Sequence, residues 1–290
     1  MRGKVNHGSP DEKGRRAGAA SVSSCEMGVE LPDWMAPDYR VIHTDHTTAV
    51  VRSDFLEFFE RHRLVDCPLG PAITSPQADD ASPGEESGIT GGRGGARVVS
   101  AGPLGEAVVR PCRRGGWVER VNRRRYFLGD RAFAELVTTH RLRKRGAPVP
   151  EPLAAVQSAA RPGYVACLVT RRLPRAHSAA TVLADASEKR LELVLEGMGR
   201  AIRSFHEAGG IHADLNAHNL IVTEDGEGPV FVIDLDRASV AAGPAPARRA
   251  RRNLKRLKRS FRKLQLDEAL SGWVVLEHAY AAEPDPPTAA

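Results

Sequence analysis

Short apolar runs, several of them rich in β-branched residues, recur between residues 39 and 169 of the chain and are typical of β-strands. These runs predict strands over residues 39–51, 97–100, 106–110 and 164–169. Ser53 can cap a short helix over 54–63, and Asp130 can cap a longer helix that ends at about residue 145. Pro150 and Pro152 then continue the chain in an extended segment. This half of the chain is therefore predicted to be mostly β.

The second half changes to a helical period. A helix is expected over 188–208, because apolar residues recur there every three or four positions, at Leu191, Val194, Leu195, Met198, Ile202 and Phe205. Two short strands, 220–222 and 230–233, follow with a Glu-Asp-Gly turn between them. A basic helix is expected from about residue 248 to 266. We therefore predict an α+β chain whose second part is mainly helical.

Composition sets the boundaries of these parts. The first 30 residues are polar, and residues 68–95 are rich in Pro, Gly, Ser and Asp, so we expect a disordered tail and a flexible loop. We divide the chain into a tail, a small N-terminal lobe, a C-terminal lobe that includes the basic helix, and a second tail, over 1–30, 31–170, 171–270 and 271–290.

Positive charge is concentrated in one segment. The 290 residues carry a net charge of +6, from 42 basic and 36 acidic side chains. Residues 248–263 hold ten Arg and Lys and no acid, and the remaining 32 basic residues are outnumbered by the 36 acidic ones. Such a segment suits phosphates on ATP, on anionic lipid or on nucleic acid. Nucleic acid is less favoured, because Phe261 is the one aromatic residue nearby.

Composition also bears on location. No apolar run approaches the roughly 20 residues that span a bilayer, and the N-terminus lacks the apolar block of a signal peptide. The four cysteines are scattered and form no zinc-binding spacing. We therefore expect a cytoplasmic protein with reduced thiols. The basic helix can hold this protein at an anionic membrane surface.

The chemistry is expected after the helix over 188–208. Asp214 is followed five residues later by Asn219, and Asp234 ends the apolar strand that comes next. In kinases an Asp at the first position orients a hydroxyl nucleophile, and the Asn and second Asp hold Mg²⁺ on the phosphates of ATP. Alternatively, Asp214 and Asn219 could belong to a polar turn with Asx caps. The following strand, which ends in Asp234, favours phosphoryl transfer over this alternative.

Neighbouring polar residues have less definite roles. Asp236 can be a second metal ligand or can pair with Arg237, and the structural role is slightly favoured. His212 more often orients such a loop than acts as a base, and His218 is expected at the surface.

A cation for the ATP phosphates is expected on a strand before the first long helix. No Lys occurs between Lys13 and Lys144, so if this role exists an Arg fills it, and Arg110 ends a strand. Glu135, on the helix that follows, is its expected partner, since an Arg fork can bind phosphate and carboxylate together. An exposed Arg and a solvated Glu remain the alternative. The glycines at 91–95 can cover phosphates, although such runs are more often linkers.

The chain resembles the bacterial 3-deoxy-D-manno-octulosonic acid (Kdo) kinase and lipopolysaccharide core kinase family. Six segments carry the resemblance in the family's order: RRGG at 113–116, RAFAEL at 131–136, PVPEPLAA at 148–155, HADLNAHNLIV at 212–222, VIDLDRA at 232–238 and NLKRLKRSFRK at 253–263. Two departures stand out. Leu235 replaces an aromatic residue that is usual in the family, and Pro111-Cys112 replaces a polar-aromatic pair.

The resemblance implies a two-lobed protein-kinase-like fold with a small, mostly β N-lobe and a mainly helical C-lobe. It implies a membrane-peripheral enzyme that moves the γ-phosphate of ATP to a sugar hydroxyl, on Kdo of Kdo-lipid A or on core heptose. By similarity, Asp214 matches the catalytic Asp, Asn219 and Asp234 match the metal ligands, and Arg110 and Glu135 match the ATP-binding pair. Alternatives are an atypical Ser/Thr protein kinase, or a non-catalytic pseudokinase or basic binding protein.

Overall fold

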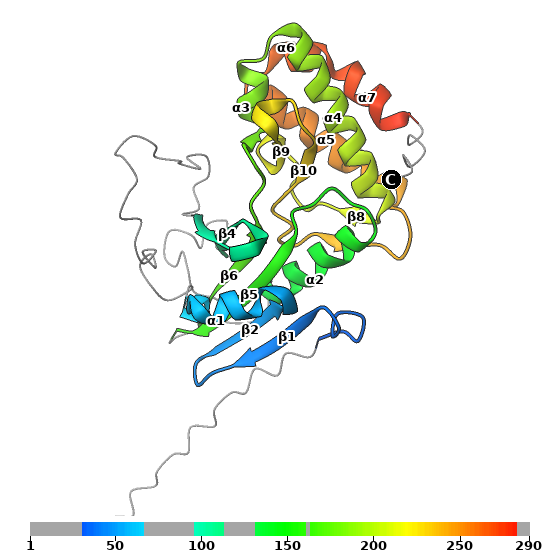
Figure 1. Cartoon of the computed structure of the whole chain (residues 1–290). Helices are drawn as coiled ribbons and strands as arrows, with labels where there is room; N and C mark the ends of the chain where they lie inside the picture. Colours follow the sequence, from blue (N-terminus) through cyan, green and yellow to red (C-terminus); the bar gives the residue numbers. More distant parts are fainter. Residues whose placement is uncertain (1–30, 67–95, 113–130, 161–162, 283–290) are drawn as a thin grey trace, which may run out of the picture. The chain divides into compact units, whose positions relative to one another are not determined.

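The computed structural model describes residues 31–66, 96–112, 131–160 and 163–282 (Figure 1). The expected tail over 1–30, the loop over 68–95 with its glycines, the segment at 113–116 and the capping Asp130 lie outside these ranges. Among the described residues, no helix combines the length and the apolar character that crossing a bilayer would require.

A six-stranded antiparallel sheet forms the first lobe. Its strands in spatial order are β1, β2, β5, β6, β4 and β3. Their bounds are Tyr39–His43, Thr47–Arg52, Pro152–Ala159, Tyr164–Arg171, Glu106–Pro111 and Arg97–Ser100. The strands expected at 97–100, 106–110 and 164–169 are therefore confirmed.

Two details of the first lobe differ from the prediction. The single strand expected over 39–51 is a hairpin, in which Tyr39 pairs with Arg52. The extended segment after Pro150 is strand β5, whose side chains are buried except at its end. Pro152 is tolerated as its first residue, where a missing N–H disrupts little of the ladder.

Helices α1 and α2 pack against this sheet. Helix α1, Leu56–Arg61, follows a 3₁₀ turn, and Ser53 lies inside that turn and does not cap the helix. Its buried Phe59 and the buried Phe55 of the turn share a core with the sheet. Helix α2, Arg131–Lys144, packs on β5 and β6.

The second lobe is mainly helical, as predicted. Its helices are α3 (Ala179–Ala184), α4 (Glu188–Glu207), α5 (Ala247–Lys263), α6 (Asp267–Ser271) and α7 (Trp273–Ala281). The apolar stripe of α4 lies in the core with Phe261 and Trp273. At Gly199 of α4 a Cβ would lie 2.5 Å from the Leu276 carbonyl oxygen, so only glycine allows α4 and α7 to pack this closely.

The tail predicted over 271–290 is wrong for residues 273–281. These residues form helix α7, which packs along α4 (Figure 1). The side chains of Trp273 and Leu276 are buried. The apolar residues of α7 are separated by a Glu and a His, and the Pro-rich stretch that follows masked their helical period. The C-terminal lobe therefore extends at least to residue 281.

Short strands connect these helices around the predicted loop. Strands β9 (Leu220–Val222) and β10 (Val230–Val232) form the expected hairpin, and β7 (His177–Ser178) joins it. Strands β8 (Gly210–Ile211) and β11 (Ser239–Val240) form a second pair. The residues between β8 and β9 thus form a loop with a fixed strand at each end.

Candidate active site

His212 organises the loop between β8 and β9. Its Nδ1 accepts a hydrogen bond from the backbone N–H of Asp214 at 3.0 Å, and its Nε2 lies 2.9 Å from the carbonyl oxygen of Ile233. Since a carbonyl only accepts, the proton must be on Nε2 and the ring is neutral. Burial lowers the pKa of His212, although the Ile233 carbonyl and two nearby carboxylates oppose this shift. The orienting role expected for His212 agrees with these bonds.

Two asparagines close the loop around Asp214. The side-chain amides of Asn216 and Asn219 donate to the Asp214 carbonyl oxygen at 3.0 and 2.9 Å. The Asn216 side-chain oxygen accepts from the N–H of His218 at 2.9 Å, which is the Asx turn considered from the sequence. Asp214 itself is exposed, so its carboxylate can receive the proton of a hydroxyl group.

Asp234 lies beside this loop. The N–H of Ile233 donates to the Asn219 carbonyl oxygen at 3.0 Å, which sets Asp234 next to the loop that carries Asn219 and Asp214. Asp234 has a backbone φ of 59°, in the left-handed region that non-glycine residues seldom adopt. Strain of this kind persists where surrounding contacts hold it, and it concentrates at functional sites. The structure thus brings together the three polar residues predicted from the sequence.

Arg110 bridges the two lobes. Its guanidinium bonds the carboxylate of Glu135 on α2 and lies 3.2 Å from a carboxylate oxygen of Asp234. Burial raises the pKa of Glu135, and the charge of Arg110 opposes that rise. Burial disfavours the charge of Arg110, but Glu135 and Asp234 outweigh burial and raise its pKa. Glu135 is buried and Arg110 is partly exposed, so removing Arg110 would leave the Glu135 carboxylate buried without its ion-pair partner, which is destabilising.

A second bridge was missed from the sequence. The carboxylate of Asp236 accepts hydrogen bonds from both Nε and Nη2 of Arg131, and the bond from Nε is 3.0 Å long. The favoured structural role of Asp236 agrees with this pairing, but its main partner is Arg131, and Arg237 lies 4.0 Å away. Arg131 and Glu135 are one turn apart on α2, so the spacing Arg-x-x-x-Glu was the available signal.

Helix α5 holds the loop from the other side, which was also missed. Asn253 is buried, accepts from the His212 N–H at 3.1 Å and donates to the His212 carbonyl oxygen at 2.7 Å. The same Asn253 oxygen lies 3.1 Å from Nε2 of His206, whose Nδ1 lies 3.0 Å from the Tyr280 hydroxyl. A substitution that removes the Asn253 side-chain amide would therefore remove both hydrogen bonds to the His212 backbone.

Two further residues of α5 bond the same loop. Arg256 bonds the Ala213 carbonyl oxygen, and the Ser260 hydroxyl accepts from the Ala217 N–H at 3.1 Å. Asn253, Arg256 and Ser260 are three and four positions apart and so lie on one face of the helix. The charged helix that drew attention for its basicity therefore also positions the loop of Asp214.

Asn219 and Asp234 have the donors that Mg²⁺ prefers. The Asn219 amide nitrogen is engaged by Asp214, which leaves its oxygen for a ligand, and the Asp234 side chain is 46% exposed. Mg²⁺ binds such hard oxygens together with phosphate oxygens and water. Within the described ranges, no group of three or more His, Cys, Asp or Glu side chains has a metal-binding arrangement. Two oxygen donors do not complete the six-coordinate shell of Mg²⁺, so its other ligands would have to be water or phosphate oxygens.

The family model and the similar proteins that match this chain all point to one family. The family model of the lipopolysaccharide kinase (Kdo/WaaP) family matches residues 81–280. The chain is 43% identical over 215 residues to a 3-deoxy-D-manno-octulosonic acid kinase of Xanthomonas campestris pv. campestris (strain B100), across 71% of this chain and 80% of that protein. It is 37% identical over 212 residues to the enzyme of the same name from Xylella fastidiosa (strain M12), with the same coverage of each chain.

A solved structure supports the fold. The structure of WaaP in complex with acyl carrier protein superimposes with a TM-score of 0.50 at 17% identity. The match covers 81% of this chain and 89% of that one. The protein-kinase-like, two-lobed α+β fold predicted from the sequence is therefore confirmed.

Proposed function

The chain belongs to the lipopolysaccharide kinase (Kdo/WaaP) family, and on this basis we propose that it transfers the γ-phosphate of ATP to a hydroxyl of Kdo in Kdo-lipid A. Core heptose is the second candidate acceptor. The observation that carries the proposal is the loop in which His212, Asn216 and Asn219 hold the exposed Asp214.

Each polar residue of the site has a role in this proposal. Asp214 orients the acceptor hydroxyl and takes its proton as the new P–O bond forms. Arg110, held by Glu135, binds the α- and β-phosphates. Asn219 and Asp234 would hold Mg²⁺, which would neutralise charge on the phosphates as ADP leaves. Binding of ATP would draw Arg110 from Asp234 and leave that carboxylate for the cation.

A labelled-ATP assay tests the function. The protein is incubated with Mg²⁺, γ-labelled ATP and one acceptor at a time: Kdo-lipid A, heptosylated core or a generic protein. Label is expected on Kdo-lipid A, in the Kdo sugar. Label on the protein substrate alone would favour a protein kinase instead. Binding of ATP without label on any acceptor would favour a non-catalytic role.

The basic face of α5 supports a further part of the proposal, namely that the enzyme works at the cytoplasmic face of the inner membrane. Eight exposed basic residues lie on this helix: Arg248, Arg249, Arg251, Arg252, Lys255, Arg259, Arg262 and Lys263. Arg256 of the same helix bonds the loop of Asp214. An anionic glycolipid that binds this face, in a membrane or alone, would therefore place its sugar close to Asp214.

Charge neutralisation on α5 tests membrane binding. Replacing Arg248, Arg252, Lys255 and Arg259 by Gln should weaken binding to vesicles with anionic lipid by roughly 1,000-fold, since each of the four basic residues near such a surface contributes about 1 kcal/mol. Vesicle sedimentation at low salt measures the effect.

The matched control carries four Arg→Gln changes elsewhere, at Arg40, Arg61, Arg63 and Arg200, which lie outside α5. It should bind vesicles like the unaltered protein. Equal loss in both variants would mean that net charge alone drives binding, and no loss in the α5 variant would reject the membrane role of this face.

A further inference from the structure

A segment outside the family-matched range is built into the first lobe. The family model begins at residue 81, whereas β1 and β2 end at Arg52. Strand β2 is nevertheless an interior strand that pairs with β5 from Thr47 to Val51. The turn before β1 is equally fixed, because the N–H of Tyr39 donates to the Met35 carbonyl oxygen at 3.0 Å and both side chains are buried.

This turn, residues 34–39, contacts the C-terminal half of α2. The Asp38 carboxylate lies 2.6 Å from Nζ of Lys144 and 3.2 Å from Nε2 of His140, one turn apart on the helix. The Trp34 ring stacks on the His140 ring with centroids 5.6 Å apart. The guanidinium of Arg141 lies 5.0 Å from the centroid of the same indole. One short turn therefore contacts three residues of α2.

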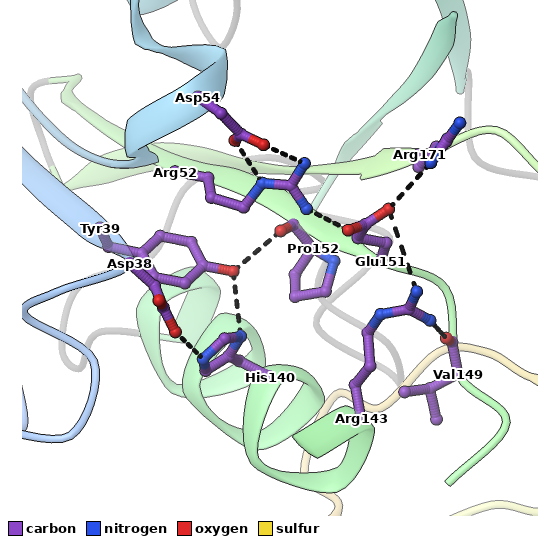
Figure 2. Close-up of polar contacts among 10 residues, drawn as sticks. All are labelled: Asp38, Tyr39, Arg52, Asp54, His140, Arg143, Val149, Glu151, Pro152 and Arg171. Atoms are coloured by element: carbon purple, nitrogen blue, oxygen red, sulfur yellow. Dashed lines mark hydrogen bonds and ion pairs between the residues drawn. The ribbon is translucent and has the colours of Figure 1, made fainter. Parts of the chain in front are cut away.

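Tyr39 joins these contacts to the sheet. Its hydroxyl donates to the Pro152 carbonyl oxygen at 2.8 Å and lies 3.3 Å from Nδ1 of His140, as Figure 2 shows. The hydroxyl thus contacts the first residue of β5 and α2 together. Through it, the position of the helix is tied to the strand on which it packs.

A second set of ion pairs starts from the second strand of the hairpin, at Arg52, which pairs with Tyr39 in the sheet. Arg52, at the end of β2, binds both oxygens of Asp54 at 2.5 and 2.8 Å and also bonds Glu151 (Figure 2). Glu151 in turn lies 4.0 Å from Arg143 of α2 and 3.4 Å from Arg171 of β6. The hairpin is therefore linked to α2 a second time, indirectly, through Glu151.

Glu135 is the residue of α2 that depends on this attachment. It lies five residues before His140, about 7.5 Å along the helix axis. A helix moves as a unit, so a tilt or slide that the turn prevents at His140 and Lys144 would also move Glu135 against Arg110. Regulatory motions of proteins include helix shifts of only 1–2 Å, and these suffice to repack ion pairs.

We propose that residues 34–39 form a brace that positions α2, so that Glu135 holds Arg110 in the orientation that binds ATP. Trp34 and Asp38 are its positioning residues, acting through α2 without touching the nucleotide. The inference rests on the role proposed above for Arg110 and Glu135. It assigns a function in phosphate binding to a segment that precedes the family-matched part of the chain.

Asp38→Ala tests the brace in the full-length protein. We expect the KM for ATP to rise about fivefold, typical of coupling through a packed network, with the KM for the acceptor unchanged. Trp34→Ala should act in the same direction, and Trp34→Phe, which keeps a ring on His140, should restore most of the affinity. The matched control is Asp66→Ala, because Asp66 pairs with Arg63 at 3.2 Å. This control should leave the KM for ATP unchanged.

A double-variant cycle distinguishes positioning from stability. If the brace acts through Glu135, Asp38→Ala should have no further effect on the KM for ATP in the Glu135→Gln background. A lower melting temperature with an unchanged KM, or independent effects of the two substitutions, would overturn the brace. An unchanged KM in Glu135→Gln alone would instead reject the proposed role of the Arg110–Glu135 pair, and the brace with it.

Discussion

Asp214→Asn is expected to lower kcat by about 10²- to 10⁴-fold, the usual contribution of a positioned general base. The amide keeps the size and most contacts of the carboxylate but cannot take the proton of the acceptor hydroxyl. The backbone of Asp214 carries the bonds to His212, Asn216 and Asn219, so the loop should keep its conformation in the variant. Steady-state phosphate transfer from labelled ATP measures the effect.

Two controls accompany this variant. The Kd for Mg²⁺-ATP and the melting temperature should stay close to those of the unaltered protein, because the change affects neither nucleotide contacts nor packing. Asp185→Asn, at an exposed position after α3, should leave kcat unchanged. An Asp214→Asn variant with unaltered kcat would exclude Asp214 as the base.

Asp234→Asn is expected to raise the Kd for Mg²⁺-ATP and to lower kcat/KM by at least about 100-fold. An amide is a weaker Mg²⁺ ligand than a carboxylate, and Mg²⁺ is central to charge neutralisation in phosphoryl transfer. The substitution also removes the negative partner of Arg110 in the nucleotide-free protein. Titration of nucleotide at several Mg²⁺ concentrations separates the two effects, because only the loss of a metal ligand changes the Mg²⁺ dependence.

Asp236→Asn is the matched comparison. The two oxygens of Asp236 are occupied by Arg131, so this variant should weaken the link between α2 and the loop with a much smaller change in Mg²⁺ dependence. An equal shift of the Mg²⁺ dependence in both variants would make Asp236 a metal ligand as well. A shift in neither would remove Asp234 from the metal site.

The elements with a clear local period were predicted well from the sequence. Helix α4 runs over 188–207 against the expected 188–208, and the β9–β10 hairpin lies where it was expected. Their apolar positions repeat with the period of the element that buries them, which is a local property. Helix α7 and strand β5 were missed, because charged residues or small residues blur that period and packing on α4 or β6 decides the structure.

The site divides in the same way. The spacing of Asp214, Asn219 and Asp234 was visible in the sequence, since the first two lie on one loop and Asp234 follows β10, which pairs with the strand after that loop. The pairing of Arg110 with Glu135 was expected because no Lys lies nearby and Arg110 ends a strand that precedes the helix of Glu135. The role of helix α5 was predicted from its charge alone. The hydrogen bond by which its buried Asn253 holds the loop was not predicted.

The sequence alone indicated the family and the fold class, because six motifs follow one another in the family's order over residues 113–263. It also indicated the residues expected to carry phosphoryl transfer, because their spacing lies within the short segment 212–238. Only the tertiary structure decided that Asp236 binds Arg131, 105 positions away, that Asn253 holds the loop, 41 positions away, and that residues 34–39 contact α2. Ion pairs and hydrogen bonds between distant segments leave no periodic trace in a sequence. They exist only once the hydrophobic packing of both lobes has brought their partners within about 3 Å.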